Sequence, residues 1–254
     1  MSETSDMNGS SETDGRTPGA GAQGLGTGQM FDGIAARYDL LNRMMSLGLD
    51  ARWRRALAQA IARRAATGGE VLDVATGTAD VALTIAAAAP SLRIVGVDPS
   101  AGMLGRGREK VAAAGLDERI TLELGDGLAL PFADDRFDAA CVSFGIRNFS
   151  DRRRGLEELA RVTRPGGLVA VLELAEPRDS GLLGAAARVH VRHVVPRLGA
   201  LLSGSREYRY LQRSIAAFPA AAEFTAMMRE VGLVDVEARP MTFGAVVLFL
   251  GRVA

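Results

Sequence analysis

The spacing of apolar residues along the chain changes near residue 71. Before that point, the apolar positions of 34–41 and 53–61 recur at helical spacing. We therefore expect two N-terminal helices with a break near Gly48. After it, short apolar runs rich in Val and Ile alternate with helical stretches. This pattern predicts strands at 71–75, 93–98, 120–125, 137–144 and 168–174, and helices at 80–88, 101–113 and 151–163.

Continuous apolar strands separated by helices indicate a parallel sheet that is covered on both faces. Two later apolar runs, at 234–240 and 245–252, are joined too tightly for a crossover helix, so we expect them to pair antiparallel. A helical insertion is predicted at 178–231. The predicted fold class is α/β, Rossmann-like, with a seven-stranded sheet that is mostly parallel and has an antiparallel last strand.

Composition narrows the class of protein. Residues 1–28 hold seven glycines and no aromatic residue, so we expect a disordered N-terminal extension before one domain at 29–254. The formal net charge is zero, which argues against nucleic-acid binding. One cysteine excludes a disulfide framework and a cysteine-based metal cage. With no spanning run and no secretory signal, a cytoplasmic protein is expected.

Polar residues follow four successive predicted strands. In open α/β sheets, ligands bind at these carboxyl ends. The first strand leads through Asp73 into Gly77 and Thr78, and the second ends in Asp98. The third ends at Asp126 and Gly127, and the fourth at Ser143. We expect these side chains to meet at one edge of the sheet.

The first of these loops distinguishes between nucleotide cofactors. Ala75 and Ala79 stand at two glycine positions of a dinucleotide fingerprint, and Asp73 and Asp80 would repel a pyrophosphate. The same charges suit the ammonium and sulfonium of S-adenosylmethionine. We therefore expect that cofactor rather than NAD. The alternative is that acidic residues at strand ends only cap the helices that follow.

Each strand end has an expected role toward this cofactor. Gly77 allows close backbone approach, and Thr78 offers a hydroxyl to the amino-acid end. Asp98 can accept both ribose hydroxyls, and Asp126 can accept from the adenine amine. Ser143 is placed beside the methionine part.

Four stretches narrow the interpretation to a family. The segments FDGIAARYDLLNRMMSLGLDARWRR (31–55) and RVTRPGGLVAVLELAEP (161–177) resemble the two signatures of the UbiE/MenG family, the ubiquinone/menaquinone biosynthesis C-methyltransferases. The segments SFGIRNFSD (143–151) and REYRYLQRSIAAFP (206–219) are also similar. The resemblance covers 31–254 and implies a class I methyltransferase whose cofactor contacts fall on Thr78, Asp98, Asp126, Gly127 and Ser143. It departs from the family at Asp50, commonly histidine, and at Ala79, usually glycine.

The resemblance implies methylation of a ring carbon of a polyprenyl quinol, with demethylmenaquinol favoured. The methoxy-benzoquinol precursor of ubiquinol, or another small molecule, remains the alternative. A binding protein without turnover is a third hypothesis, from a different class. Attack by the ring carbon requires its neighbouring hydroxyl to lose a proton, which a phenol with a pKa near 10 resists.

Arg147 and Asn148 follow the fourth strand directly. Arg147 stays protonated and can stabilise the phenolate, with Asn148 orienting the ring. The alternative is that Arg147 pairs with Asp151 or caps a turn. His190 can act as a base, and Tyr208 can contact the quinol, as can Tyr210. For the histidine and the tyrosines, structural roles are the alternative.

The segment 178–213 combines seven arginines and two acids with apolar residues. Such a helix can lie on an anionic membrane surface, so we expect peripheral contact with the inner face of the plasma membrane. An ordinary lid helix is the alternative. The sequence leaves the oligomeric state open, a homodimer included.

Overall fold

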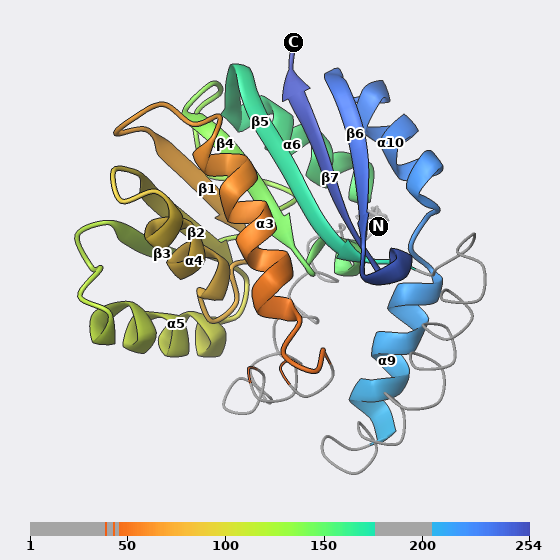
Figure 1. The fold of residues 1–254 in the computed structure, drawn as a ribbon, viewed down its shortest axis with the longest axis horizontal. Coiled ribbons are helices and arrows are strands. Elements are labelled where there is room, and N and C mark those ends of the chain that lie inside the picture. The colour runs from red at the N-terminus through yellow and green to blue at the C-terminus, as the bar shows by residue number, and fades with distance from the viewer. Residues whose placement is uncertain (1–38, 40–42, 44–45, 176–204) are drawn as a thin grey trace, which may run out of the picture.

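The computed structural model describes Asp39, Arg43 and residues 46–175 and 205–254 (Figure 1), with side chains from Tyr210 onward in the last stretch. Its centre is a seven-stranded sheet in the order β3-β2-β1-β4-β5-β7-β6. The strands are β1 (Glu70–Val74), β2 (Arg93–Asp98), β3 (Ile120–Leu124), β4 (Phe137–Ser143), β5 (Thr163–Leu174), β6 (Leu233–Met241) and β7 (Val246–Val253).

Strand direction agrees with the prediction. The first five strands pair parallel, and β7 pairs antiparallel with both β5 and β6. Only a short 3-10 turn, η3 (Thr242–Gly244), joins β6 to β7, which is too short for a crossover. The predicted fold class, with one antiparallel last strand, is confirmed.

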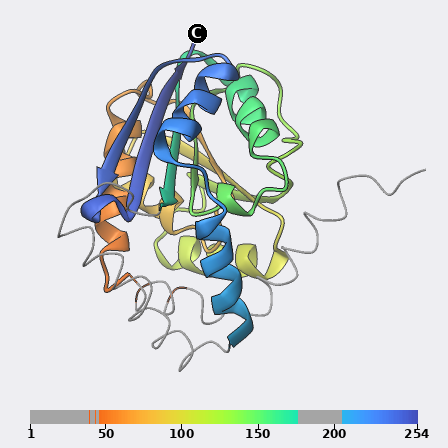
Figure 2. The same cartoon turned by 90° about the vertical axis from the view of Figure 1, so that its right-hand side faces the viewer.

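Helices cover both faces of the sheet (Figure 2). On one face lie α3 (Asp50–Ala62), α4 (Asp80–Ala88) and α5 (Ala101–Ala113), and on the other lie α6 (Arg152–Val162) and α10 (Ala221–Glu230). The bounds of α4 and α5 coincide with the predicted helices. The helix α9 (Ser205–Ala216) extends beyond the end of the sheet at which the parallel strands terminate (Figure 1).

Each face has its own apolar core. On the first, Leu57 and Ile61 of α3 pack with Ile85 of α4 over the sheet. On the second, Phe224 lies 4.7 Å from Phe249, centroid to centroid. Between the two cores, every residue of β4 from Phe137 to Val142 is buried. This is why the central strands read as unbroken apolar runs rather than alternating ones.

β5 begins earlier than predicted, at Thr163 rather than at residue 168. The additional residues contain Pro165 and two glycines and form an irregularity, where the pairing with β4 shifts register. Gly166 has a φ of +78°, and a Cβ on Gly167 would lie 2.6 Å from Thr163 Cγ2. Residues 163–167 are therefore an irregular start of the strand.

Some predictions fall on residues outside the described part. These are the extension at 1–28, most of the first N-terminal helix, the candidate base His190, and 178–204 of the insertion. The described remainder of the insertion holds α9 and α10, and α10 belongs to the layer that covers the sheet. No described helix combines the length and the apolar character required to cross a membrane.

Candidate active site

The polar residues that follow the strands lie at one edge of the sheet, as expected from its parallel order. Asp73 stands in β1, Asp98 ends β2 and Ser143 ends β4, while Asp126 follows β3. The register aligns Asp73 with Cys141 of β4 and places Gly96, two residues before Asp98, beside Asp73. In Figure 1 this edge lies at the lower side of the sheet, from which α9 projects.

The loop between β1 and α4 is bent by three residues with positive φ. Gly77 has a φ of +57°, and Ala75 and Ala79 have φ values of 55° and 65°. Glycine adopts this region freely, but alanine does so at a cost of about 1 kcal/mol or more. The two positions that carry alanine in place of a fingerprint glycine therefore keep the glycine conformation.

Asp73 is buried at the base of this loop. Its side chain is 1% exposed and accepts a hydrogen bond from Thr76 Oγ1 at 2.7 Å. The pKa of Asp73 is raised to about 7, chiefly by burial and to a smaller extent by the nearby charge of Asp98, against the lowering effect of the hydrogen bonds from Thr76 and Cys141. At neutral pH this carboxyl group therefore exists in both protonation states.

Asp98 joins the loop to the next helix. Its Oδ2 accepts from the backbone N–H of Gly77 and its Oδ1 from that of Ser100, both at 2.9 Å. Ser100 in turn caps α5, because its hydroxyl accepts from Met103 N. Asp98 thus ties the loop to the residue that caps α5, but the cap itself is Ser100, and not Asp98 as the alternative would require. Each carboxylate oxygen can accept a second hydrogen bond, so this role does not exclude binding of a ribose.

Thr78 belongs to a charged network that the sequence did not reveal. Its hydroxyl donates to Asp39 Oδ1 at 2.6 Å and accepts from Lys110 Nζ at 3.1 Å. Lys110 also pairs with Asp39 and Asp80, and Arg54 Nη1 lies 2.9 Å from Asp80 Oδ2. The available signal was that Lys110 is the only lysine of the chain.

This network corrects one premise of the sequence argument. Asp73 and Asp80 were expected to present two open negative charges to the ligand. That expectation is wrong, because two cations neutralise Asp80 and burial holds Asp73 partly protonated. Asp50, at the position where the family commonly has histidine, is buried, accepts from Ser46 and pairs with Arg54 at 2.9 Å.

Asp126 and Gly127 form a tight turn after β3. Asp126 Oδ1 accepts from Leu128 N at 2.9 Å. A Cβ on Gly127 would lie 2.6 Å from Phe149 Cζ and 2.9 Å from Val74 Cγ1. The glycine therefore lets Phe149 pack closely against the turn, and this packing holds Asp126 at the sheet edge.

Arg147 lies in the 3-10 turn η1 (Ile146–Asn148), directly after β4. Its Nη1 lies 2.7 Å from Glu173 Oε1 and also donates to the carbonyl of Phe144. Glu173 is fully buried and Arg147 is 9% exposed. The expected alternative partner was wrong, because Asp151 instead caps α6 by accepting from Arg154 N at 2.9 Å.

Three buried polar atoms in this region lack a hydrogen-bond partner among the described residues. They are Ser143 Oγ, Arg147 Nε and Arg152 Nε, and the last belongs to a guanidinium whose Nη2 donates to Arg147 O at 3.2 Å. Buried polar atoms are rarely left unsatisfied, because each costs about 1–3 kcal/mol. Ser143 Oγ and Arg147 Nε, four residues apart at the end of β4, are the kind of feature that a bound polar ligand satisfies.

Asn148 connects η1 to α9. Its Oδ1 accepts from the hydroxyl of Tyr210 at 3.2 Å. The sequence offered Tyr208 as well as Tyr210 on this helix, but the side chain of Tyr208 lies outside the described part, as does all of His190. Within the described residues, no group of three or more His, Cys, Asp or Glu side chains could hold a metal ion.

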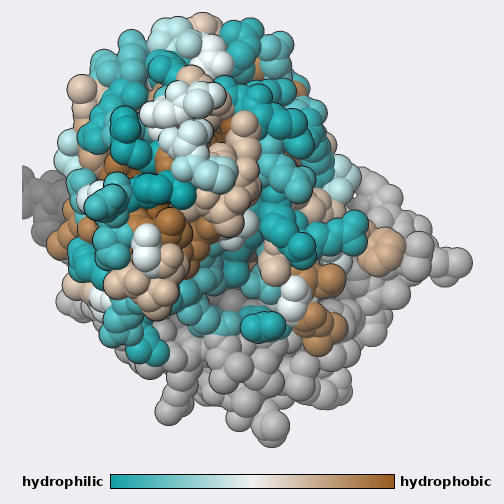
Figure 3. Space-filling view, turned by 60° about the vertical axis from the view of Figure 1, so that its left-hand side comes forward, coloured by the Kyte–Doolittle hydropathy of each residue, from teal (hydrophilic) through white to brown (hydrophobic). Residues whose placement is uncertain are grey.

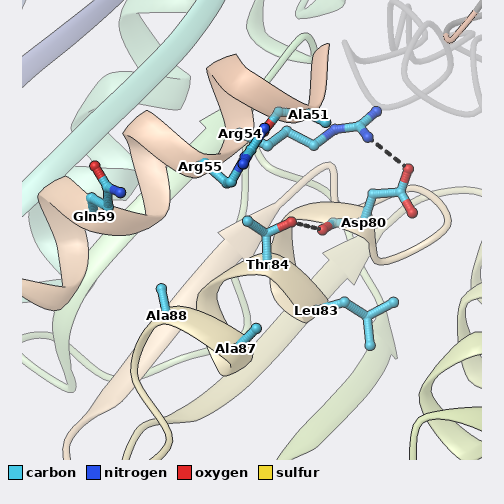
Figure 4. Close-up of a pocket in the computed structure, with 9 residues that line it drawn as sticks. All are labelled: Ala51, Arg54, Arg55, Gln59, Asp80, Leu83, Thr84, Ala87 and Ala88. Atoms are coloured by element: carbon cyan, nitrogen blue, oxygen red, sulfur yellow. Dashed lines mark hydrogen bonds and ion pairs between the residues drawn. The ribbon is translucent and has the colours of Figure 1, made fainter. Parts of the chain in front are cut away.

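A groove of about 600 Å³ lies between α3 and α4 (Figure 4). Arg54 reaches across it to Asp80, and Ala87 and Ala88 line its far end. Arg147 and Ser143 do not line it. Through Asp80 the groove borders the network at Thr78, and it lies apart from the two unsatisfied atoms at the end of β4.

Solved structures with low sequence identity share this fold. The cyclase SpnF has a TM-score of 0.64 at 20% identity, over 91% of this chain and 96% of that one. A SAM-dependent methyltransferase from Aquifex aeolicus has a TM-score of 0.53 at 16% identity, over 74% and 83%. Because one of the two is a cyclase, the likeness establishes the fold and not the reaction.

Relatives at higher identity cover nearly the whole chain. The protein named ubiquinone/menaquinone biosynthesis C-methyltransferase UbiE in Geobacter sulfurreducens is 47% identical, over 88% of this chain and 86% of its own. Demethylmenaquinone methyltransferases of Deinococcus radiodurans and Thermus thermophilus are each 45% identical, over 90% and 87% of this chain and 93% and 99% of theirs. The model of the ubiE/COQ5 methyltransferase family matches residues 21–252. The chain therefore belongs to the ubiE/COQ5 methyltransferase family.

Proposed function

We propose that the protein methylates a ring carbon of a reduced polyprenyl quinone, with demethylmenaquinol as its substrate and S-adenosyl-L-methionine as the methyl donor. The family and the fold imply this cofactor, and the names of the relatives supply the substrate class. The main support for the proposal is the state of Arg147 at the end of β4. Glu173 fixes its guanidinium, while its Nε has no hydrogen-bond partner among the described residues.

The sheet edge fits the cofactor. A Cβ on Gly77 would meet nothing within 4 Å, so a ligand can approach the loop backbone there. Asp98 would hold the ribose hydroxyls, and Asp126 the adenine amine. Asp73, Thr78 and the unsatisfied Ser143 Oγ would hold the methionine part. When bound, S-adenosyl-L-methionine supplies an electrophilic methyl group on a sulfonium.

The part of this chain in the reaction is to orient the ring and stabilise charge. Arg147 keeps its proton, so its Nε–H can donate to the oxygen of a developing phenolate beside the methylated carbon. Glu173 already accepts from Arg147 N, Arg147 Nη1 and Leu174 N, so it fixes the guanidinium and does not serve as the base. We infer that the phenolic proton leaves to water.

Pre-arranged donors of this kind contribute more than donors in water, because no reorganisation is required when the charge develops. Alignment of the ring with the methyl group can contribute about 7–11 kcal/mol. Both effects depend on a rigid η1. The buried Arg147–Glu173 pair and the bond from Arg147 Nη1 to the Phe144 carbonyl supply that rigidity.

Transfer of a labelled methyl group from S-adenosyl-L-methionine to reduced demethylmenaquinol tests the proposal. The prenylated methoxy-benzoquinol and an unrelated phenol are run in parallel. Labelled demethylmenaquinol is the expected product. Methylation of the phenol alone, or cofactor binding without any product, would refute the proposal, and exclusive use of the benzoquinol would reassign the substrate.

Arg147→Lys is the matching variant, because lysine keeps the charge beside Glu173 and removes the Nε–H. We expect kcat to fall about 100-fold while the cofactor Kd is unchanged. Arg136→Gln is the control, since Arg136 packs over Phe132 and Phe137 at the opposite end of β4. Equal activity of the two variants would remove Arg147 from the reaction.

A second part of the proposal is peripheral contact with an anionic membrane, where a polyprenyl substrate resides. Exposed large apolar residues are few in the described part, and hydrophilic residues dominate the face in Figure 3. There are four in this part, and all lie near the sheet edge of the site: Leu47, Leu49, Leu124 and Phe243. Leu49 precedes α3, Leu124 ends β3, and a 2.8 Å bond from Trp53 ties α3 to Thr242 beside Phe243.

Exposed arginines accompany these apolar residues. Arg52 and Arg55 are exposed on the first two turns of α3, and neither pairs with an acid of the described chain. Apolar side chains next to cations suit an anionic lipid surface. We expect Arg52→Glu/Arg55→Glu to abolish flotation with anionic vesicles. Arg63→Glu/Arg64→Glu, at the other end of α3, is the control, and equal loss in both variants would contradict this surface.

A further inference from the structure

The side chain of Tyr210, on α9, reaches η1, the turn that carries Arg147. Its hydroxyl donates to Asn148 Oδ1 at 3.2 Å, next to Arg147. α9 extends beyond the sheet edge and contacts η1 (Figure 1). The hydroxyl is therefore held where a ring presented to Arg147 would lie between α9 and the end of β4.

The electrostatics keep this hydroxyl protonated. Burial raises the pKa of Tyr210, and the positive charge of Arg147 lowers it by a smaller amount. A phenol that donates a hydrogen bond to Asn148 still has oxygen lone pairs, and these can accept a hydrogen bond from another hydroxyl. Tyr210 is thus suited to accept a hydrogen bond from a neutral ring hydroxyl.

Asn148 lies on a fixed backbone and can therefore orient the Tyr210 hydroxyl. It follows Arg147 in η1, and its backbone N–H donates to Gly145 O at 3.0 Å. The backbone of η1 is also fixed through Arg147 N and Glu173 at 3.2 Å. A rigid acceptor therefore sets the direction of the Tyr210 hydroxyl.

We infer that Tyr210 is a substrate-contacting residue: its hydroxyl, oriented by Asn148, accepts a hydrogen bond from a ring hydroxyl of the quinol and positions the ring against Arg147. This inference rests on the proposed function and adds to it a determinant of substrate choice. A hydroxyl-bearing ring is retained by this contact, and a ring that lacks the hydroxyl loses it. The competing interpretation is that the Tyr210–Asn148 bond only fastens α9 to η1.

The experiment compares Tyr210→Phe with the wild-type enzyme on a prenylated naphthalenediol and on its two monomethyl ethers. For the diol, we expect KM to rise and kcat/KM to fall about 3- to 10-fold, as for loss of one neutral hydrogen bond. The KM for S-adenosyl-L-methionine should not change. With one of the two ethers, the difference between variant and wild type should vanish, because the partner hydroxyl is already absent.

Ser214→Ala is the matched control on α9, because the Ser214 hydroxyl donates only to Leu211 O within the helix, at 2.9 Å. It should leave all constants at wild-type values. A Tyr210→Phe penalty that persists with both ethers, that raises the cofactor KM, or that Ser214→Ala shares would overturn the inference in favour of a fastening role. If Tyr210→Phe does not fold, Asn148→Ala gives the same comparison, because it removes the acceptor that orients the Tyr210 hydroxyl.

The two proposals fail differently. Wild-type enzyme that does not methylate the diol refutes the proposed function. Wild-type enzyme that methylates it, with Tyr210→Phe equally active, refutes only the role of Tyr210.

Discussion

Asp73→Asn should remove a pH-dependent loss of stability. Asp73 is 1% exposed, and no lysine, arginine or histidine is among the groups that shift its pKa. Its pKa is about 7 in the fold against 3.8 as the ordinary value. Asparagine has the same shape and can accept the Thr76 hydroxyl, but it does not titrate.

The direction in which stability changes with pH follows from which state, folded or unfolded, holds the Asp73 proton. Between pH 3.8 and about 7 the folded protein keeps the Asp73 proton and the unfolded chain has lost it. Stability therefore falls as pH rises, by about 1.4 kcal/mol per pH unit for one proton. Over the whole interval the cost is on the order of 4 kcal/mol, which is an upper bound because a strained site relaxes.

Urea unfolding of both proteins from pH 4 to pH 8.5 measures this effect. We expect Asp73→Asn to gain stability relative to the wild type as pH rises, with the gain levelling off above about pH 7. Asp138→Asn is the contrasting variant, because Asp138 is also buried but pairs with Arg164 and accepts from Ala66 N and Glu70 N. It should be destabilised at neutral pH. If the free energies of unfolding of the wild type and Asp73→Asn differ by the same amount at pH 5 and at pH 8.5, the reasoning is refuted.

Three further outcomes test the packing around the site. Gly127→Ala should lower the free energy of unfolding by about 1–3 kcal/mol, because the new Cβ meets Phe149 Cζ at 2.6 Å; an unchanged urea midpoint would contradict this. Arg161→Ala should lower the free energy of unfolding by about 2 kcal/mol near pH 7, because it removes the cation that lowers the pKa of buried Glu158. The difference in unfolding free energy between this variant and the wild type should shrink below about pH 4.5, where Glu158 becomes protonated. Cys141, the sole cysteine, is buried and has a raised pKa because of burial and the neighbouring acid, so a thiol reagent should label it only as fast as the protein unfolds; prompt labelling of the folded protein would show that the strand is open.

The elements that the sequence predicted well are those set by local periodicity. The bounds of α4 and α5 coincide with the predicted helices, and β2 with a predicted strand. The start of β5 differs, because Pro165 and two glycines are locally typical of a turn, yet the pairing of Thr163 with Phe137 extends the strand past them. Pairing between distant residues overrode the local preference there.

The site residues also fall into those that the local sequence pattern predicts and those that only tertiary structure places. The positions of Asp98, Asp126 and Ser143 follow from where strands end, which the apolar pattern indicates. The partner of Arg147 does not follow, because Glu173 is 26 residues away and meets it only when β5 lies beside β4. Tyr208 and Tyr210 could not be separated from the sequence, since which of the two reaches Asn148 depends on how α9 is placed against η1.

The sequence by itself determined the succession of strands and helices along the chain, which strands are buried, and the edge at which polar residues gather. These features depend on spacing within a few residues. Tertiary structure alone decided which charges are neutralised. Lys110 meets Asp39 and Asp80 from 71 and 30 residues away, and Asp73 changes its pKa because strands on both sides remove it from water. The charge of a carboxyl group depends on its surroundings in space, and these form only when distant segments pack together.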